Sequence, residues 1–124
     1  MSFDWRKPTT QMLGRWQPWH DGHTALFERA LAVTGQVVIL VRDVQGLEDN
    51  PFDYEHVWHG IRDGLQAAGH AYTGQYIVMR VPNIVDISYG RGVGYTFTEH
   101  DLEPELKEIS ATKIRAEMRE QGKL

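Results

Sequence analysis

Two histidines three residues apart stand at the start of an apolar helical pattern and are well placed for chemistry. His20 and His23 enclose Gly22, and residues 24–33 then repeat apolar side chains at helical spacing. A helix that begins there directs its free backbone N–H groups, and the positive end of its dipole, toward whatever the two imidazoles face. Such an arrangement binds anions, and a glycine lets the backbone approach the ligand without a Cβ. The spacing therefore predicts a phosphate site.

A second candidate anion site lies near the C-terminus, where residues 110–121 are predicted to form a helix. Ser110 is a preferred N-cap residue, but Lys113 occupies the position where a capping box has Glu or Gln. A cation there opposes the helix dipole, and this cost is explained if an anion binds. The expected donors are Lys113, Arg115 and the hydroxyl groups of Ser110 and Thr112.

Both segments resemble motifs of one superfamily, the HxGH nucleotidyltransferases. Gly14 to His23, GRWQPWHDGH, is similar to the GRFQPFHxGH segment of archaeal-type nicotinamide mononucleotide adenylyltransferases. Ile109 to Arg115, ISATKIR, resembles the ISxTxIR segment that completes the triphosphate site in the same superfamily. The resemblance implies an enzyme that moves a nucleoside monophosphate from ATP or CTP to a small phosphorylated acceptor. Pyrophosphate is released, and Mg²⁺ accompanies the triphosphate.

The resemblance also implies roles for the motif residues. His20 and His23 are expected to donate hydrogen bonds to the α-phosphate as charge builds in an in-line displacement, and Arg115 to assist them. The expected nucleotide contacts are Gly14, Arg15, Trp16, Gly22, Arg42, Ser110, Thr112 and Lys113. Of these, Ser110, Thr112 and Lys113 are expected to bind the β- and γ-phosphates together with Arg115. Arg42 is explained equally well as a surface arginine, and Trp16 as core or pocket wall.

The base of the nucleotide and the acceptor stay open. Residues 54–56, YEH, resemble the YEHR of glycerol-3-phosphate cytidylyltransferases, but Val57 replaces the arginine. The RTEG that precedes the last cytidylyltransferase motif is absent, which favours ATP slightly. Residues 90–94, GRGVG, stand where the adenylyltransferases have SGNPLV; they predict a turn between strands, with Arg91 as a candidate acceptor contact. The segment from 82 to 108 is short compared with those enzymes.

The elements expected to position these residues alternate between strand and helix. Strands are predicted at 10–13, 37–41, 76–81, 84–89 and 95–98, with helices from about 22 to 34 and from 54 to 68. Gly35 is expected to end the first helix, and Asp53 is a candidate cap of the second. The unbroken apolar run at 37–41 is typical of a central parallel strand covered on both faces. The predicted fold is α/β, a small Rossmann-like parallel sheet flanked by helices, in a single domain spanning 1–124. Ligands bind such sheets beyond the carboxyl ends of the strands.

Composition narrows the class of protein. The chain has 124 residues, a net charge of −4 and no cysteine. This charge argues against a non-specific nucleic-acid binder, and thiolate metal sites are excluded. No apolar run suits a signal peptide or a membrane span, so a cytoplasmic protein without membrane partners is expected. Aromatic residues in segments outside the expected core, such as Phe3, Trp5 and Tyr72, predict a homodimer.

Two alternatives to the enzyme remain. One is a non-catalytic module that binds a nucleotide and regulates a partner. The other is a histidine-metal protein, in which His56 and His59 would complete a site with His20 and His23. The residues flanking the first histidine pair have no part in metal ligation, so the phosphate site is favoured and no metal ligand is assigned.

Overall fold

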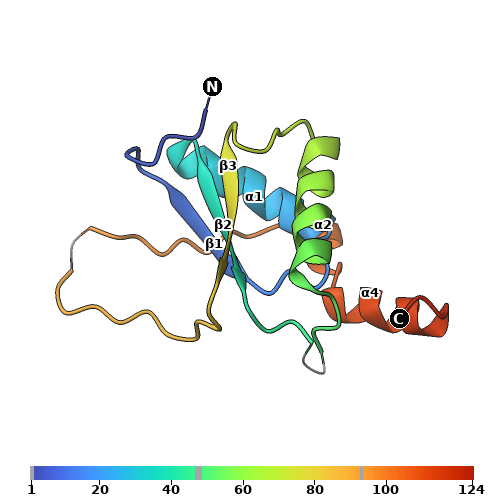
Figure 1. Cartoon of the computed structure of the whole chain (residues 1–124). Helices are drawn as coiled ribbons and strands as arrows, with labels where there is room; N and C mark the ends of the chain where they lie inside the picture. Colours follow the sequence, from blue (N-terminus) through green and yellow to red (C-terminus); the bar gives the residue numbers. More distant parts are fainter. Residues whose placement is uncertain (1, 47–48, 93) are drawn as a thin grey trace.

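Three parallel strands form the sheet, and each crossover between them is a helix. The computed structural model describes residues 2–46, 49–92 and 94–124. Strands β1 (Thr10–Gly14), β2 (Val37–Arg42) and β3 (Tyr76–Val81) pair in the order β1-β2-β3. Helices α1 (Asp21–Thr34) and α2 (Tyr54–Ala67) connect them (Figure 1). The predicted α/β fold, a small Rossmann-like parallel sheet flanked by helices, is confirmed.

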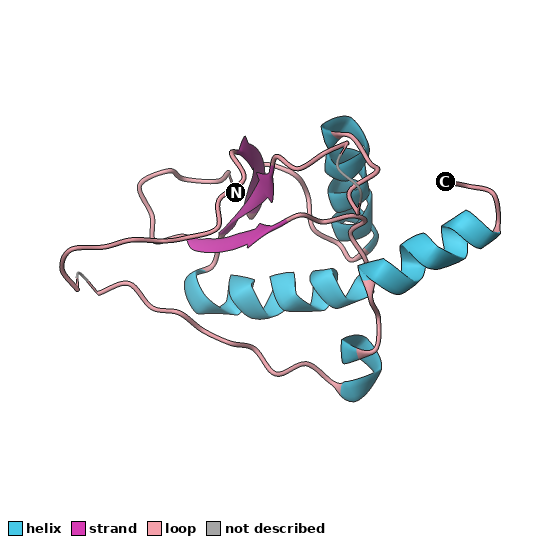
Figure 2. Ribbon diagram, turned by 90° about the horizontal axis from the view of Figure 1, so that it is seen from below, coloured by secondary structure: helices cyan, strands magenta, loops and turns pink. Residues whose placement is uncertain are grey.

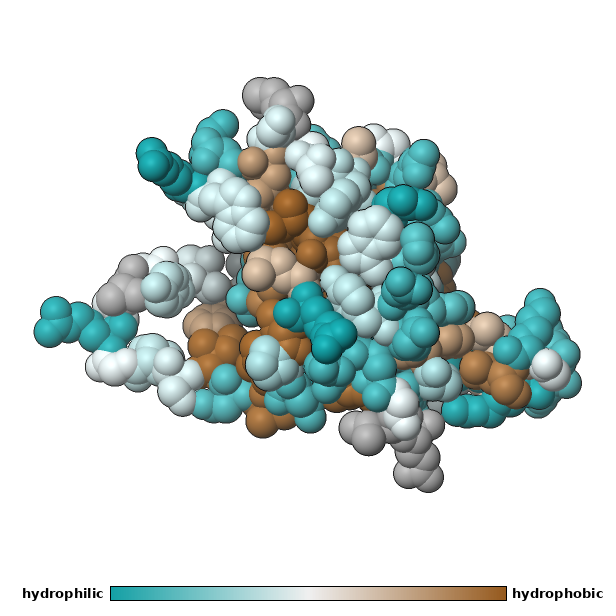
Figure 3. Space-filling view, in the orientation of Figure 1, coloured by the Kyte–Doolittle hydropathy of each residue, from teal (hydrophilic) through white to brown (hydrophobic). Residues whose placement is uncertain are grey.

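Both crossover helices pack on one face of the sheet. Val37, Ile39 and Val41 of β2 have their side chains on that face and are fully buried, in one cluster with core residues of α1 and α2. Val38 and Leu40, on the opposite face, are only half-buried. Two right-handed crossovers that advance in the same direction put their helices on the same side. The expectation that β2 is covered on both faces was therefore wrong, and Figure 3 shows apolar residues at the centre of the molecule's surface in this region.

The helix ends follow the predicted local signals. Gly35 ends α1 with a φ of 89°, a left-handed conformation that glycine adopts at no steric cost. Asp53 caps α2 and accepts a hydrogen bond from the backbone N–H of His56 at 2.9 Å. Ser110 caps α4 (Ala111–Glu120) in the same way. A short helix before it, α3 (Pro104–Lys107), was not predicted.

The strands predicted at 84–89 and 95–98 were wrong. The described residues of 82–103 form a long loop that extends away from the sheet (Figure 1). Val93 lies outside the described residues. The loop is anchored at its end, where Arg29 of α1 bonds the carbonyl of Asp101 and pairs with Glu103 at 3.1 Å. A segment with alternating apolar side chains forms a strand only where a neighbouring strand pairs with its backbone N–H and C=O groups. Within the described residues, no strand pairs with this segment.

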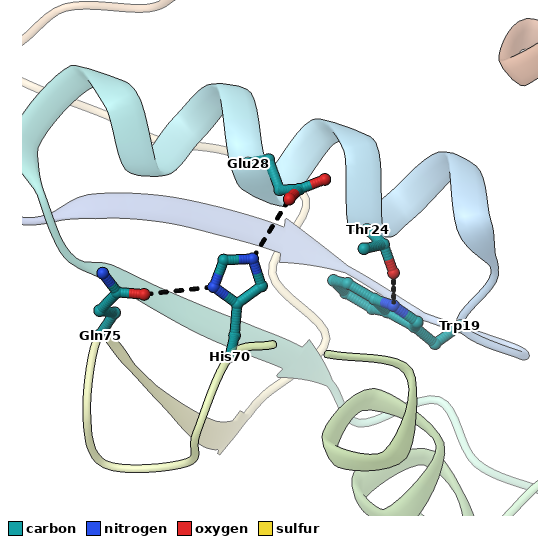
Figure 4. Close-up of polar contacts among 5 residues, drawn as sticks. All are labelled: Trp19, Thr24, Glu28, His70 and Gln75. Carbon is teal, nitrogen blue, oxygen red and sulfur yellow. Dashed lines mark hydrogen bonds and ion pairs between the residues drawn. The ribbon is translucent and has the colours of Figure 1, made fainter. Parts of the chain in front are cut away.

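At the amino ends of the strands, buried and half-buried polar side chains bind the backbone and the neighbouring helices. The amide of buried Gln36, just before β2, accepts from the N–H of Asp4 at 3.1 Å and donates to its carbonyl at 2.7 Å. His70, after α2, contacts Glu28 of α1 at 3.3 Å and Gln75 at 3.2 Å (Figure 4).

In the described part of the chain, no helix is long and apolar enough to cross a membrane.

Candidate functional site

The candidate site is built around two stacked imidazole rings at the start of α1. His20 is the N-cap, and its ring lies over that of His23 with 3.6 Å between ring centroids and 18° between ring planes. Nδ1 of His20 accepts the backbone N–H of Gly22 at 3.1 Å, and Nδ1 of His23 accepts the N–H of His20 at 3.2 Å. The two histidines thus cap the helix together, as a capping box does.

This geometry determines where the imidazole protons are. A ring nitrogen that accepts a backbone N–H carries no proton, so each neutral ring carries its hydrogen on Nε2. Burial, followed by the neighbouring His20, lowers the pKa of His23 to about 3, and burial also lowers the pKa of His20. Both rings are therefore neutral near pH 7. They present two Nε2–H donors, neither of which has a hydrogen-bond partner in the described part of the chain.

Two tryptophans fix the loop that carries these histidines. Trp16 is buried, donates its indole N–H to the carbonyl of Leu40 at 3.1 Å, and meets His23 edge-on. A Cβ on Gly14 would lie 2.7 Å from the Trp16 ring, so only glycine fits there. Trp19 is also buried and donates to Thr24 Oγ1 of α1 at 2.8 Å (Figure 4). Trp16, an expected nucleotide contact, belongs to the core and forms a wall behind His23.

The structure gives a steric reason why residue 22 is a glycine, which the sequence did not reveal. A Cβ at this position would lie 2.9 Å from Cε1 of His20 and 3.2 Å from the carbonyl oxygen of Leu106 in α3. The ring of His20 can therefore lie over the first turn of α1 only if residue 22 has no side chain. The predicted close approach of this backbone to a phosphate remains a prediction.

Arg115 joins the C-terminal motif to the histidine loop. Its Nη1 donates to the carbonyl of Gln17 at 2.5 Å, across 98 residues of sequence, and Nη2 contacts Thr112 Oγ1 at 3.3 Å. Arg115 is 3% exposed, and its Nε has no hydrogen-bond partner among the described residues. Figure 2 shows α4 beginning close to the start of α1. The two motifs of the sequence thus meet at one end of the sheet.

Two arginines, Arg15 and Arg115, lie at the junction where the histidine loop (residues 15–20) meets the start of α4. Burial, followed by the guanidinium of Arg15, lowers the pKa of Arg115, although an arginine stays protonated. Arg15 Nη1 contacts the buried Asn50 Oδ1 at 3.4 Å. The carboxylate of Asp49 acts in the opposite direction and raises the pKa of Arg115, but among the described residues no carboxylate is hydrogen-bonded to this guanidinium. A buried cation of this kind is costly unless an anion binds beside it. Asn50 and Gln17 were missed as site residues because their partners lie far along the chain.

The remaining predicted residues are distributed unequally around this junction. Ser110 and Thr112 lie at the start of α4 next to Arg115, and the side chain of Lys113 is exposed there. Arg42, at the end of β2, contacts Asn83 Oδ1 at 2.9 Å and lines a hollow of about 420 Å³. Arg91 is exposed, and the loop of residues 82–103 that carries it extends away from the sheet in both views (Figures 1 and 2).

The histidines of α2 make aromatic contacts of their own. His56 stacks on Phe52 with 4.2 Å between ring centroids, and His59 contacts Trp58. The described residues contain no group of three or more His, Asp or Glu side chains placed to hold a metal ion.

Comparison with known proteins identifies no family. No protein-family model matches the chain, and no curated protein matches it.

Proposed function

We propose that this protein transfers a nucleoside monophosphate from ATP or CTP to a small phosphorylated acceptor and releases pyrophosphate. The observation that carries the proposal is the meeting of two neutral histidines with the buried Arg115. In the described part of the chain, neither Nε2–H of the histidines has a hydrogen-bond partner and no carboxylate is hydrogen-bonded to Arg115. Hydrogen-bond donors and a cation on two segments that meet suit a ligand with several phosphate oxygens. The motif resemblance supports the same chemistry.

In the proposed reaction, a phosphate oxygen of the acceptor attacks the α-phosphorus of the triphosphate. The bond between the α-phosphorus and the oxygen that bridges to the β-phosphate breaks, and pyrophosphate leaves with that oxygen. His20 and His23 donate Nε2–H hydrogen bonds to the α-phosphate oxygens, where negative charge develops in the transition state. Neutral rings suit this role, since they donate without losing a proton.

Arg115 and the start of α4 are proposed to hold the leaving group. A guanidinium binds phosphate oxygens at two points, and the Nε of Arg115 is a donor without another hydrogen-bond partner in the described structure. The hydroxyls of Ser110 and Thr112 and the exposed ammonium group of Lys113 lie on the same helix start. Arg15, held by Asn50, adds a further positive charge.

Mg²⁺ is proposed to arrive with the triphosphate. The residues at the junction are hydrogen-bond donors and cations, which suit phosphate oxygens and do not form a cage for a metal ion. A magnesium ion on the triphosphate would neutralise charge on the leaving pyrophosphate. Every protein contact proposed here is made to phosphate oxygens.

The proposal is tested first by binding and then by turnover. Thermal unfolding is followed with ATP, CTP, GTP and UTP in the presence of Mg²⁺, because a ligand at about 100 times its Kd adds about 2.7 kcal/mol to the stability. Pyrophosphate release is then measured with the stabilising nucleotide and a panel of phosphorylated acceptors. We expect ATP or CTP to stabilise the protein and one acceptor to give turnover. Stabilisation without turnover would favour the non-catalytic module, and no stabilisation by any triphosphate would contradict the proposal.

A further inference from the structure

One buried amide joins the three segments that meet at the candidate site. Gln17 is 2% exposed, and its side chain donates from Nε2 to the carbonyl of Phe52 and accepts at Oε1 from the N–H of Phe52, each at 3.0 Å. An amide is the side chain that offers a donor and an acceptor side by side. Gln17 therefore ties the loop before α1 to the residue that precedes the cap of α2.

The backbone of the same residue holds Arg115. The Gln17 carbonyl accepts from Arg115 Nη1 at 2.5 Å, and His20 follows three residues later. The other bond of this guanidinium, to Thr112, stays within α4. The Gln17 carbonyl is thus the contact that relates the position of Arg115 to the histidine loop.

We propose that Gln17 is a positioning residue for the transfer reaction. Its amide, locked onto Phe52, sets the direction of the Gln17 carbonyl, and this carbonyl sets where Arg115 stands relative to His20 and His23. The inference rests on the proposed function, and Gln17 acts without touching the substrate. A buried amide costs free energy unless both of its groups are bonded, so an apolar side chain would serve better if packing were its only purpose.

The pair of hydrogen bonds between the Gln17 amide and the Phe52 backbone forms a clamp, and two substitutions break it in different ways. Gln17→Glu places a carboxylate oxygen against the Phe52 carbonyl, so an attraction becomes a repulsion. Gln17→Met removes both hydrogen bonds with little change of side-chain length and adds no charge. Either change frees the Gln17 carbonyl to rotate and lets Arg115 shift.

The chain offers a matched control in Gln36. This residue is 6% exposed and makes the same reciprocal pair of hydrogen bonds, with the backbone of Asp4. It precedes β2, whereas Gln17 follows β1, so it lies at the opposite end of the parallel sheet. Gln36→Glu and Gln36→Met should lower stability as the Gln17 substitutions do, without disturbing Arg115.

The experiment measures kcat and the KM for the triphosphate, per folded protein, for wild type and the four variants. A misplaced catalytic group costs about 10- to 100-fold in rate, so we expect kcat to fall by about this factor in both Gln17 variants. The KM should change less than kcat, and both constants should stay at the wild-type value in the Gln36 variants. A double variant, Gln17→Met with Arg115→Lys, should be no slower than Arg115→Lys alone, because Gln17 acts through that guanidinium.

A second readout needs no turnover. The ¹⁵N–¹H signal of the Arg115 Nε–H group should move in the Gln17 variants and stay in place in the Gln36 variants. Equal kcat values for Gln17 and Gln36 variants in an active wild-type background would overturn the positioning role alone. A wild type that releases no pyrophosphate with any nucleotide and acceptor would instead refute the proposed function, and the inference with it.

Discussion

Replacing Gly22 with alanine tests whether the ring of His20 is held over the first turn of α1. Helix propensity alone predicts that Gly→Ala inside a helix stabilises the fold by about 0.5–1 kcal/mol. At this position, however, the new Cβ would lie 2.9 Å from Cε1 and 3.0 Å from Nδ1 of His20. The ring has to swing away, which breaks its bond to the Gly22 N–H and its stack on His23. Loss of the bond and local repacking cost about 1–3 kcal/mol, so we expect a net loss of about 1 kcal/mol.

The control for this change is Gly60→Ala in α2. Nothing lies within 4 Å of a Cβ built on Gly60, so that variant should be stabilised as propensity predicts. Urea unfolding gives the two free energies, and the ¹⁵N shifts of the His20 and His23 rings report which nitrogen carries the proton. If Gly22→Ala were as stable as Gly60→Ala and left both ring signals unchanged, His20 would not be held as described.

The remaining predictions concern charge. Lys113→Glu completes a capping box below Ser110 and should raise the free energy of unfolding by a few tenths of a kcal/mol, while triphosphate affinity measured by calorimetry falls sharply. An unchanged triphosphate affinity would show that the residues at the start of α4 only cap the helix and do not bind phosphate. The pKa of His23 is about 3 in the folded protein and 6.5 in the unfolded chain, so the unfolded chain takes up the proton first as the pH falls. Stability should therefore be complete above pH 6.5 and decrease below it by up to about 1.4 kcal/mol per pH unit. Urea unfolding at about pH 7 and pH 5 measures the decrease, and His23→Gln should reduce it. A decrease of equal size in His23→Gln would show that other groups cause it.

Local patterns in the sequence predicted the elements that depend on local signals. The apolar run at 37–41 became the central strand, Gly35 ended α1, and Asp53 and Ser110 capped their helices. The HxGH segment also predicted the helix start correctly, since α1 begins at Asp21. Each of these features is decided by residues within one turn of the place where it occurs.

Features that depend on distant partners were not predictable in this way. The alternating apolar residues of 84–89 indicated a strand, but whether a strand forms depends on a neighbour that a local pattern does not name. The bond from Arg115 to the Gln17 carbonyl spans 98 residues, and the clamp between Gln17 and Phe52 spans 35. The tautomer of the two histidines follows from how each ring folds back on the backbone, which the spacing alone left open.

The central claim is that the neutral histidines donate hydrogen bonds to the reacting phosphate, and His20→Asn tests it most directly. Asparagine is a preferred N-cap whose side-chain oxygen accepts a backbone N–H, so the cap of α1 is kept while the Nε2–H donor is lost. With the nucleotide and acceptor that give turnover, we expect kcat for pyrophosphate release to fall about 100-fold. The Kd for the triphosphate and the free energy of unfolding should change little. A His20→Asn variant that keeps the wild-type kcat would contradict the claim.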